Sequence, residues 1–397
     1  MKRSLEITII FLYPLMLFFI VLYLVLNIAK ADPNIASFET NMRTYGQTLC
    51  GKLATYSGDD QWGQPNGLND TYYDGQRVFY NLRDYTNDLT WLPCAERAEA
   101  IYRDRYVNGT GSGKCNGGFC AGYWIFTRGL LESFRRTGDT VSKQAVVNLS
   151  KNASFCRDTT AEDPTDPQYM REIAYCVNAF LDAEKVGEPR RVRLSTYVNA
   201  LHSQLNQIFV TNSYTGLVQP FWVALASEAL IHYAEDVGDP RVTPLLDKVG
   251  KELYLRFWLV TDQSFKMNTN DPSGTKDLNL LIAPLYAYVF DQTLQTWFRD
   301  KFDEIFNSGV AYGYFASGKQ FNQNYRWSID GLRWRARALP TPTPVPTATS
   351  TAIPTPKPTI APTIAPTIHP CEKAPASTSP FSGASCTNYF LKQIRDK

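Results

Sequence analysis

The sequence is poor in the residues that build metal and redox sites. It has only three histidines (His202, His232 and His369), and its eight cysteines include no CxxC pair. Zinc and thiol redox sites usually need such closely spaced ligands, so the sequence predicts no metal and no other cofactor. Cysteines outside these motifs favour disulfides, which persist in oxidising compartments. We therefore expect the protein to be exported.

An excess of charge of one sign is also absent. The chain has 40 Lys and Arg residues against 38 Asp and Glu residues, which gives a net charge of +2. Proteins that bind nucleic acids usually carry a marked basic excess on the binding domain. The composition therefore predicts no nucleic-acid partner and no other polyanionic partner.

A turn recurs about every 50 residues, a period typical of repeat architectures. Each turn separates two stretches whose apolar residues have helical spacing. Where the turn holds a glycine, that residue can end one helix, and the acidic residue after it can cap the next. The turns are Tyr85-Thr86-Asn87-Asp88, Thr137-Gly138-Asp139, Val186-Gly187-Glu188-Pro189, Val237-Gly238-Asp239-Pro240 and Phe290-Asp291.

The two helices of each predicted hairpin differ in how their apolar residues are distributed. Residues 221–233 are apolar around most of the helix, whereas residues 242–257 carry a single apolar stripe. The first pattern is typical of a buried helix and the second of a helix that covers a surface, which predicts an inner and an outer ring. Five hairpins between residues 74 and 307, with a sixth made by helices near 35–56 and 321–336, predict an all-α (α/α)6 toroid. An open solenoid of the same hairpins is the alternative.

The two ends of the chain differ from the helical part. Residues 7–28 carry no charge and are long enough to span a bilayer, while Ala29-Lys30-Ala31 fits a signal-peptide cleavage site. The sequence therefore predicts either a membrane protein with an extracytoplasmic domain or a protein secreted after cleavage behind Ala31. The expected organisation is an anchor or signal peptide (1–31), the toroid domain (32–338), a Pro/Thr-rich linker (339–370) and a short cysteine-containing tail (371–397).

Pairing each cysteine with a near neighbour accounts for all eight. The first pair would join adjacent outer helices once the ring closes, the next two would each staple a loop, and the last would lie in the tail. The expected disulfides are Cys50–Cys94, Cys115–Cys120, Cys156–Cys176 and Cys371–Cys386.

Polar and aromatic residues gather at the starts of the predicted inner helices, where the long loops of a closed ring would meet. A concave, aromatic-rich opening with convergent polar groups is typical of a ligand site. Carboxylate pairs there could hydrolyse glycosides, and the flat faces of Tyr and Trp suit sugar rings. The candidate acids are Asp74, Glu172 and Asp277, and the candidate ligand contacts are Tyr73, Arg77, Tyr123, Trp124, Arg171, Gln219, Trp222, Asn279, Asn324, Arg326 and Trp327.

Side chains of these kinds also have structural uses. Carboxylates cap helices, acidic and basic neighbours form structural ion pairs, and a residue before a proline can mark a helix start. These alternatives apply to Asp74 and Asp277, to Glu172 with Arg171, and to Gln219. For Asn322, Asn324 and Arg326 the alternative is a hydrogen-bonding clasp that closes the ring.

The period and order of the helices over residues 35–336 resemble those of the six-hairpin glycosidase superfamily. The resemblance implies an (α/α)6 domain with its sugar site at the mouth of the inner helices, and it implies Asp74, Glu172 or Asp277 as the catalytic acid. The chain lacks an Asp-Asp pair of the kind used by mannan-cleaving members and a Cys/His zinc set like that of arabinofuranosidase members. It also lacks the DxDD and DDxxD motifs of terpene cyclases and prenyltransferases.

The sequence thus predicts an extracytoplasmic carbohydrate-active protein, similar to glycoside hydrolases, that binds or cleaves a polysaccharide. The alternative is a non-catalytic surface or filament protein that uses the toroid as a packing or glycan-binding module. Carboxylates that converge in an open pocket would favour hydrolysis, whereas carboxylates held in buried ion pairs would favour the structural class.

Overall fold

The computed structural model of the protein describes residues 33–56, 67–110, 114–116, 120–159 and 163–337. All of these residues belong to one compact unit. None of the described helices is both long and apolar enough to cross a membrane. The predicted membrane segment, the Pro/Thr-rich linker and the Cys371–Cys386 pair lie outside the described residues.

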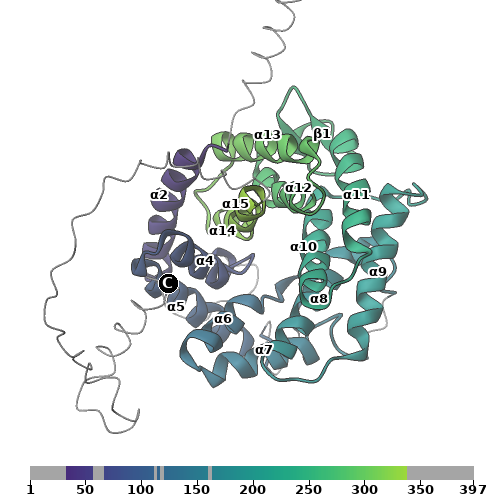
Figure 1. Ribbon diagram of the computed structural model, residues 1–397. Helices are drawn as coiled ribbons and strands as arrows, with labels where there is room; N and C mark the ends of the chain where they lie inside the picture. The colour runs from purple at the N-terminus through teal and green to yellow at the C-terminus, as the bar shows by residue number, and fades with distance from the viewer. Residues whose placement is uncertain (1–32, 57–66, 111–113, 117–119, 160–162, 338–397) are drawn as a thin grey trace, which may run out of the picture. The chain divides into compact units, whose positions relative to one another are not determined.

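The described part of the chain is mostly helical (Figure 1), so the all-α prediction is confirmed. The α-helices are α2 (Ile35–Leu53), α3 (Gly67–Asp70), α4 (Gly75–Thr86), α5 (Leu92–Glu99), α6 (Arg128–Thr137), α7 (Thr140–Asn152), α8 (Met170–Lys185), α9 (Val192–Phe209), α10 (Pro220–Val237), α11 (Val242–Phe257), α12 (Asn279–Thr293), α13 (Thr296–Tyr312), α14 (Gly318–Tyr325) and α15 (Ser328–Arg337).

Short elements join these helices. A three-stranded antiparallel sheet lies between α11 and α12, and in it Phe265 pairs with Trp258 on one side and with Thr275 on the other. The short elements are β1 (Trp258–Leu259), β2 (Ser264–Lys266), β3 (Gly274–Thr275), the 3-10 turns η1 (Leu89–Trp91), η3 (Gly122–Trp124), η4 (Pro167–Tyr169) and η5 (Lys276–Leu278), and the π-helical turn η2 (Ala100–Val107).

The turns within hairpins follow the Gly/Asp pattern of the sequence. Gly138 has a φ of 74° after α6, and Asp139 then accepts hydrogen bonds from the backbone N–H groups of Val141 and Ser142 at the start of α7. Gly238 likewise has a φ of 75° after α10. Because residues with a Cβ rarely adopt such values, glycine allows the chain to leave one helix and enter the next within two residues after α6 and four residues after α10.

The even-numbered helices from α4 to α14 contact one another in series. α4 contacts α6, α6 contacts α8, α8 contacts α10, α10 contacts α12, α12 contacts α14, and α14 contacts α4. In Figure 1, α5, α7, α9, α11 and α13 lie on the outer side of this series. α12 buries every residue from Asn279 to Phe290, whereas α11 buries one stripe that includes Val242, Leu246 and Leu253. The contrast between broadly buried and one-sided helices therefore matches the sequence pattern.

Helix α2 packs against helices from the other end of the described chain. The Phe38 ring lies 5.1 Å from the Phe306 ring of α13 and 4.9 Å from the Tyr325 ring of α14, measured between ring centroids. The Tyr325 hydroxyl donates a hydrogen bond of 2.8 Å to the Phe38 carbonyl, and the Asn41 side chain donates one of 2.9 Å to the Val310 carbonyl. The helix predicted near residues 35–56 therefore contacts the helix predicted near residues 321–336.

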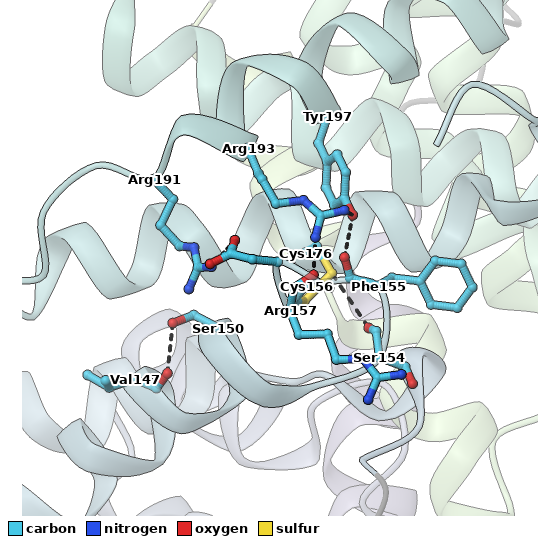
Figure 2. Close-up of a disulfide and its surroundings, with 11 residues drawn as sticks. Val147, Ser150, Ser154, Phe155, Cys156, Arg157, Cys176, Arg191, Arg193 and Tyr197 are labelled. Atoms are coloured by element: carbon cyan, nitrogen blue, oxygen red, sulfur yellow. Dashed lines mark hydrogen bonds and ion pairs between the residues drawn. A yellow bond between two sulfur atoms is a disulfide. The ribbon is translucent and has the colours of Figure 1, made fainter. Parts of the chain in front are cut away.

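Three of the four predicted disulfides are confirmed, and the fourth lies outside the described residues. Cys50–Cys94 joins α2 to α5, and Cys115–Cys120 closes a short loop. Cys156–Cys176 ties the segment after α7 to α8. Figure 2 shows Tyr197 and Arg193 of α9 reaching the same segment, where they donate hydrogen bonds to the carbonyls of Phe155 and Arg157.

Candidate functional site

A polar cavity of about 380 Å³ lies among helices α4, α6, α10 and α15. The residues that line it come from one face of each helix, at spacings of three or four positions, which places them on a common side. They are Arg77, Asn81 and Asp84 of α4, Arg128 and Glu132 of α6, His232 and Glu235 of α10, and Asp330, Arg333, Trp334 and Arg337 of α15. The cavity thus holds four guanidinium groups and four carboxyl groups.

A buried ion triad adjoins this cavity, and one of its members, Arg77, forms part of the cavity wall. Arg77 Nη1 lies 2.5 Å from Glu228 Oε1, and Arg326 Nε lies 2.8 Å from Glu228 Oε2. The Glu228 side chain is fully buried and the two arginines are nearly so. Burial alone would raise the pKa of Glu228, but the charges of Arg326 and Arg77 outweigh it and hold that pKa well below its usual range. The triad therefore stays charged and joins α4, α10 and the segment between α14 and α15.

His232 lies one helical turn after Glu228 and lines the cavity. Its Nδ1 lies 2.8 Å from the side-chain oxygen Oδ1 of Asn178 in α8. Burial, reinforced by the positive charge of Arg128, lowers the pKa of His232 well below its usual value, although the carboxylate of Glu228 opposes this. The imidazole is therefore neutral around pH 7.

Two carboxyl groups in the cavity have raised pKa values. Burial raises the pKa of Asp330, although Arg77 at 3.7 Å and Arg333 at 3.0 Å lower it in part. Burial also raises the pKa of Glu235, and the neighbouring Asp330 charge adds to the effect. Asp330 is held between two arginines, whereas Glu235 has no ion-pair partner among the described residues. Glu235 is thus the cavity carboxyl group with no competing ion pair in the described part of the chain, and its protein partner is the side chain of Trp334.

The predicted acid Asp74 holds two helices together. Its side chain accepts hydrogen bonds from the backbone N–H of Arg77, where it caps α4, and from the backbone N–H of Gly129 in α6, at 3.2 and 3.1 Å. Asp74 is buried and has a φ of 67°, a left-handed conformation that Asp and Asn adopt more readily than most residues. Asp74 is not among the residues that line the cavity.

Replacing Asp74 with alanine is expected to lower the free energy of unfolding by about 1–2 kcal/mol, because two buried N–H groups lose their acceptor. Asp74→Asn should cost less, since its single amide oxygen can still accept one of the two hydrogen bonds and asparagine tolerates the left-handed conformation. Urea unfolding of the two variants measures the difference. Equal stability of Asp74→Ala and the wild type would show that the cap contributes little.

The other two predicted acids also have partners near the starts of inner helices. Glu172 Oε1 accepts hydrogen bonds from Arg171 at 2.5 and 3.0 Å. Asp277 Oδ1 accepts one of 2.9 Å from the backbone N–H of Tyr314. Neither residue lines the cavity. Glu172 forms the ion pair that the structural interpretation predicts, whereas Asp277 binds a distant backbone N–H group and does not cap the inner helix α12.

The predicted aromatic contacts are divided between buried and accessible positions. Tyr73, Trp124 and Trp327 are at most 4% exposed, and the Trp327 Nε1–H donates to the Leu281 carbonyl at 2.6 Å. Tyr123 and Trp222 are partly exposed, and the Arg171 guanidinium lies 5.1 Å from the centre of the Tyr123 ring. Only these last two could offer a ring face to a ligand without a rearrangement.

The remaining predicted contacts mostly bind other parts of the chain. Asn279 donates to the Gln263 carbonyl at 2.9 Å and to Ser308 Oγ at 3.2 Å, so it holds the loop between β1 and β2. Asn324 donates to the Tyr314 carbonyl at 3.0 Å. Gln219 precedes α10, and its side chain makes no capping hydrogen bond. Arg77 and Arg326 are brought together through Glu228, as described above.

Sequence reasoning missed several residues of the cavity and its wall, among them Arg128, Glu228, His232, Glu235 and Asp330. One signal was available, because Glu228 and His232 interrupt an otherwise apolar helix. A charged residue inside a buried helix needs a partner, and that need points toward the arginines of other inner helices.

No family model, no curated protein and no solved structure matches this chain. The assignment of a function therefore rests on the chemistry of the cavity and on the predicted export of the chain.

Proposed function

We propose that the protein is an extracytoplasmic carbohydrate-binding protein whose ligand occupies the cavity among α4, α6, α10 and α15. The observation that carries the proposal is the cavity itself, in which guanidinium and carboxyl groups are present in equal number. A sugar hydroxyl can both donate and accept a hydrogen bond. Such a lining therefore suits a neutral, hydroxyl-rich ligand better than a lipid or a polyanion.

An aromatic residue at the cavity supports a sugar more than another polar compound. Trp334 lines the cavity and packs edge-on against Tyr288 and Trp327. Trp334 is only 5% exposed, so it adds a small apolar contact beside the polar lining, and an indole fixed by its neighbours loses little entropy when a ligand binds.

We further propose that the domain is an (α/α)6 toroid outside the cytoplasm, either anchored by residues 7–28 or secreted after cleavage behind Ala31. The closed series of contacts from α4 through α14 and back to α4 favours the toroid over an open solenoid. The three disulfides favour an oxidising compartment. We propose that the resemblance to six-hairpin glycosidases extends to the architecture of the domain.

Binding is preferred to hydrolysis because the three predicted acids have structural partners. Asp74 caps a helix, Glu172 pairs with Arg171, and Asp277 accepts a backbone N–H. Hydrolysis would instead have to use the cavity carboxyl groups. A cleavage assay alongside each binding assay tests that possibility directly.

Glycan-array binding by the full-length chain, purified in mild detergent, tests the proposal. A bound glycan should lose at least about tenfold in affinity in Glu235→Gln, because hydrogen bonds to a charged group contribute about 1.5–3 kcal/mol. Glu96→Gln is the matched control, since Glu96 is exposed on α5 and lies outside the cavity. It should bind like the wild type.

Two results would contradict this placement of the ligand. If Asp277→Asn abolished binding while Glu235→Gln had no effect, the ligand would lie at the inner-helix starts that the sequence predicts. If the wild type bound no glycan on the array, the surface or filament alternative would be preferred.

A further inference from the structure

We propose that His232 selects the ligand of the cavity, by accepting a hydrogen bond at Nε2 from a hydroxyl group of a neutral polyhydroxy compound while Arg128 donates to that group. This inference rests on the proposed function, because it assumes that the cavity binds a glycan. It goes further in naming the recognition element and the ligand chemistry that the site accepts and rejects.

The first step is the orientation of the imidazole. The Asn178 Oδ1 atom, 2.8 Å from His232 Nδ1, is an amide oxygen and can only accept a hydrogen bond. Nδ1 therefore carries the proton in the neutral ring, and the lone pair lies on Nε2. His232 lines the cavity, and Nε2 has no hydrogen-bond partner among the described residues. The histidine thus presents an acceptor to whatever enters.

The second step is the charge around the ring. Positive groups face His232 from three other helices: Arg128 of α6, Arg77 of α4 and Lys185 of α8. On its own helix, the carboxylate of Glu228 has the opposite effect, and Glu235 with Asp330 of α15 lines the same cavity. Burial and the positive groups prevail, so the ring stays neutral and Nε2 remains an acceptor.

The third step is the donor beside it. Arg128 Nη2 lies 2.9 Å from Asp182 Oδ1, and the other oxygen of Asp182 accepts a 2.8 Å hydrogen bond from the Thr127 hydroxyl. Asp182 therefore holds the guanidinium of Arg128 in place, and Arg128 lines the cavity. An acceptor on His232 and a donor on Arg128 together match one hydroxyl group, which can use both.

This pair discriminates between ligand classes. A carboxylate, sulfate or phosphate dianion has no proton to donate, so its oxygens would face the Nε2 lone pair unfavourably. An alcohol satisfies both protein groups at once. We therefore expect neutral sugars to bind in preference to uronic acids and sulfated sugars of the same ring configuration.

The first experiment uses the neutral glycan that the wild type binds most tightly on the array, together with its monodeoxy analogues. His232→Phe keeps a ring of similar size but removes the acceptor, and the affinity for the intact glycan should fall about tenfold or more. For the analogue that lacks the recognised hydroxyl, the wild type and His232→Phe should bind equally. His202→Phe, on α9 and outside the cavity, is the matched control and should leave affinity unchanged.

The second experiment converts a pH-independent site into a pH-dependent one. Asn178→Asp places a carboxylate at Nδ1, which raises the pKa of His232 and favours the doubly protonated ring. The affinity of this variant should fall as the pH decreases from 8 to 5, because Nε2 becomes a donor. The wild type should show no such decrease. Nitrogen-15 NMR of labelled histidine should show the Nδ1–H tautomer in the wild type at pH 7.

The outcomes separate the two proposals. Glycan binding that survives in His232→Phe, or a wild-type ring protonated at Nε2, would overturn the role of His232 while leaving the cavity as a glycan site. A preference for uronic or sulfated sugars would overturn the ligand class. An absence of all glycan binding in the wild type would overturn the proposed function and this inference with it.

Discussion

Replacing Glu228 with glutamine is expected to destabilise the domain by about 3–5 kcal/mol, because the buried Arg326 loses its ion-pair partner and Arg77 keeps only Asp330, at 3.7 Å. Arg77 and Arg326 both contact Glu228, at 2.5 and 2.8 Å, and no solvent reaches its side chain. Urea unfolding at pH 7 measures the loss. Glu96→Gln removes an exposed carboxylate and should change stability by no more than about 0.5 kcal/mol.

The same variant has a pH signature. The pKa of Glu228 is lower in the folded protein than in an unfolded chain, so its contribution is fully present above the usual carboxylate pKa. The contribution is lost as the pH falls through the lowered folded value. The stability difference between wild type and Glu228→Gln should therefore shrink on acidification. A difference that stays constant from pH 7 to pH 2 would show that the triad contributes no net electrostatic stability.

Removing the Cys50–Cys94 disulfide is expected to cost about 4 kcal/mol, the loop-closure value for a bond that spans 44 residues. The double variant Cys50→Ala/Cys94→Ala tests this in thermal or urea unfolding. Cys115→Ala/Cys120→Ala is the matched control, because its bond spans only 5 residues and the same relation gives about 2 kcal/mol. Equal losses in both variants would show that loop entropy does not account for the stabilisation.

Features set by neighbouring residues could be predicted from the sequence. The left-handed glycines at 138 and 238 and the capping carboxylate of Asp139 act within one turn of chain, so their spacing revealed the hairpins. Cysteine pairs separated by few residues were predictable for the same reason. The structure also shows the contrast between broadly apolar and one-sided helices. A helix buried on most sides needs apolar residues around its circumference, whereas a helix on the surface needs them on one side only.

The site could not be predicted in the same way, because its contacts join distant segments. Glu228 and Arg77 are 151 residues apart, and nothing in their spacing indicates that they meet. The sequence predicted a ligand site at the starts of the inner helices, where aromatic residues are common. In the structure, Tyr72 packs at right angles against Tyr73 and Trp124, with ring centroids 4.7 and 4.6 Å apart. A sequence does not distinguish an aromatic residue that seals an opening from one that lines it.

The packing of α2 also determines when the domain can finish folding during synthesis. The Tyr325 hydroxyl that bonds to the Phe38 carbonyl lies 287 residues further along the chain, so α2 emerges from the ribosome long before α13 and α14 can cover it. At about 5–20 residues per second, that interval is on the order of 15–60 seconds. The bond from Cys50 to Cys94 involves a helix made much earlier. Oxidation of this pair would hold α2 against α5 until its last partners arrive.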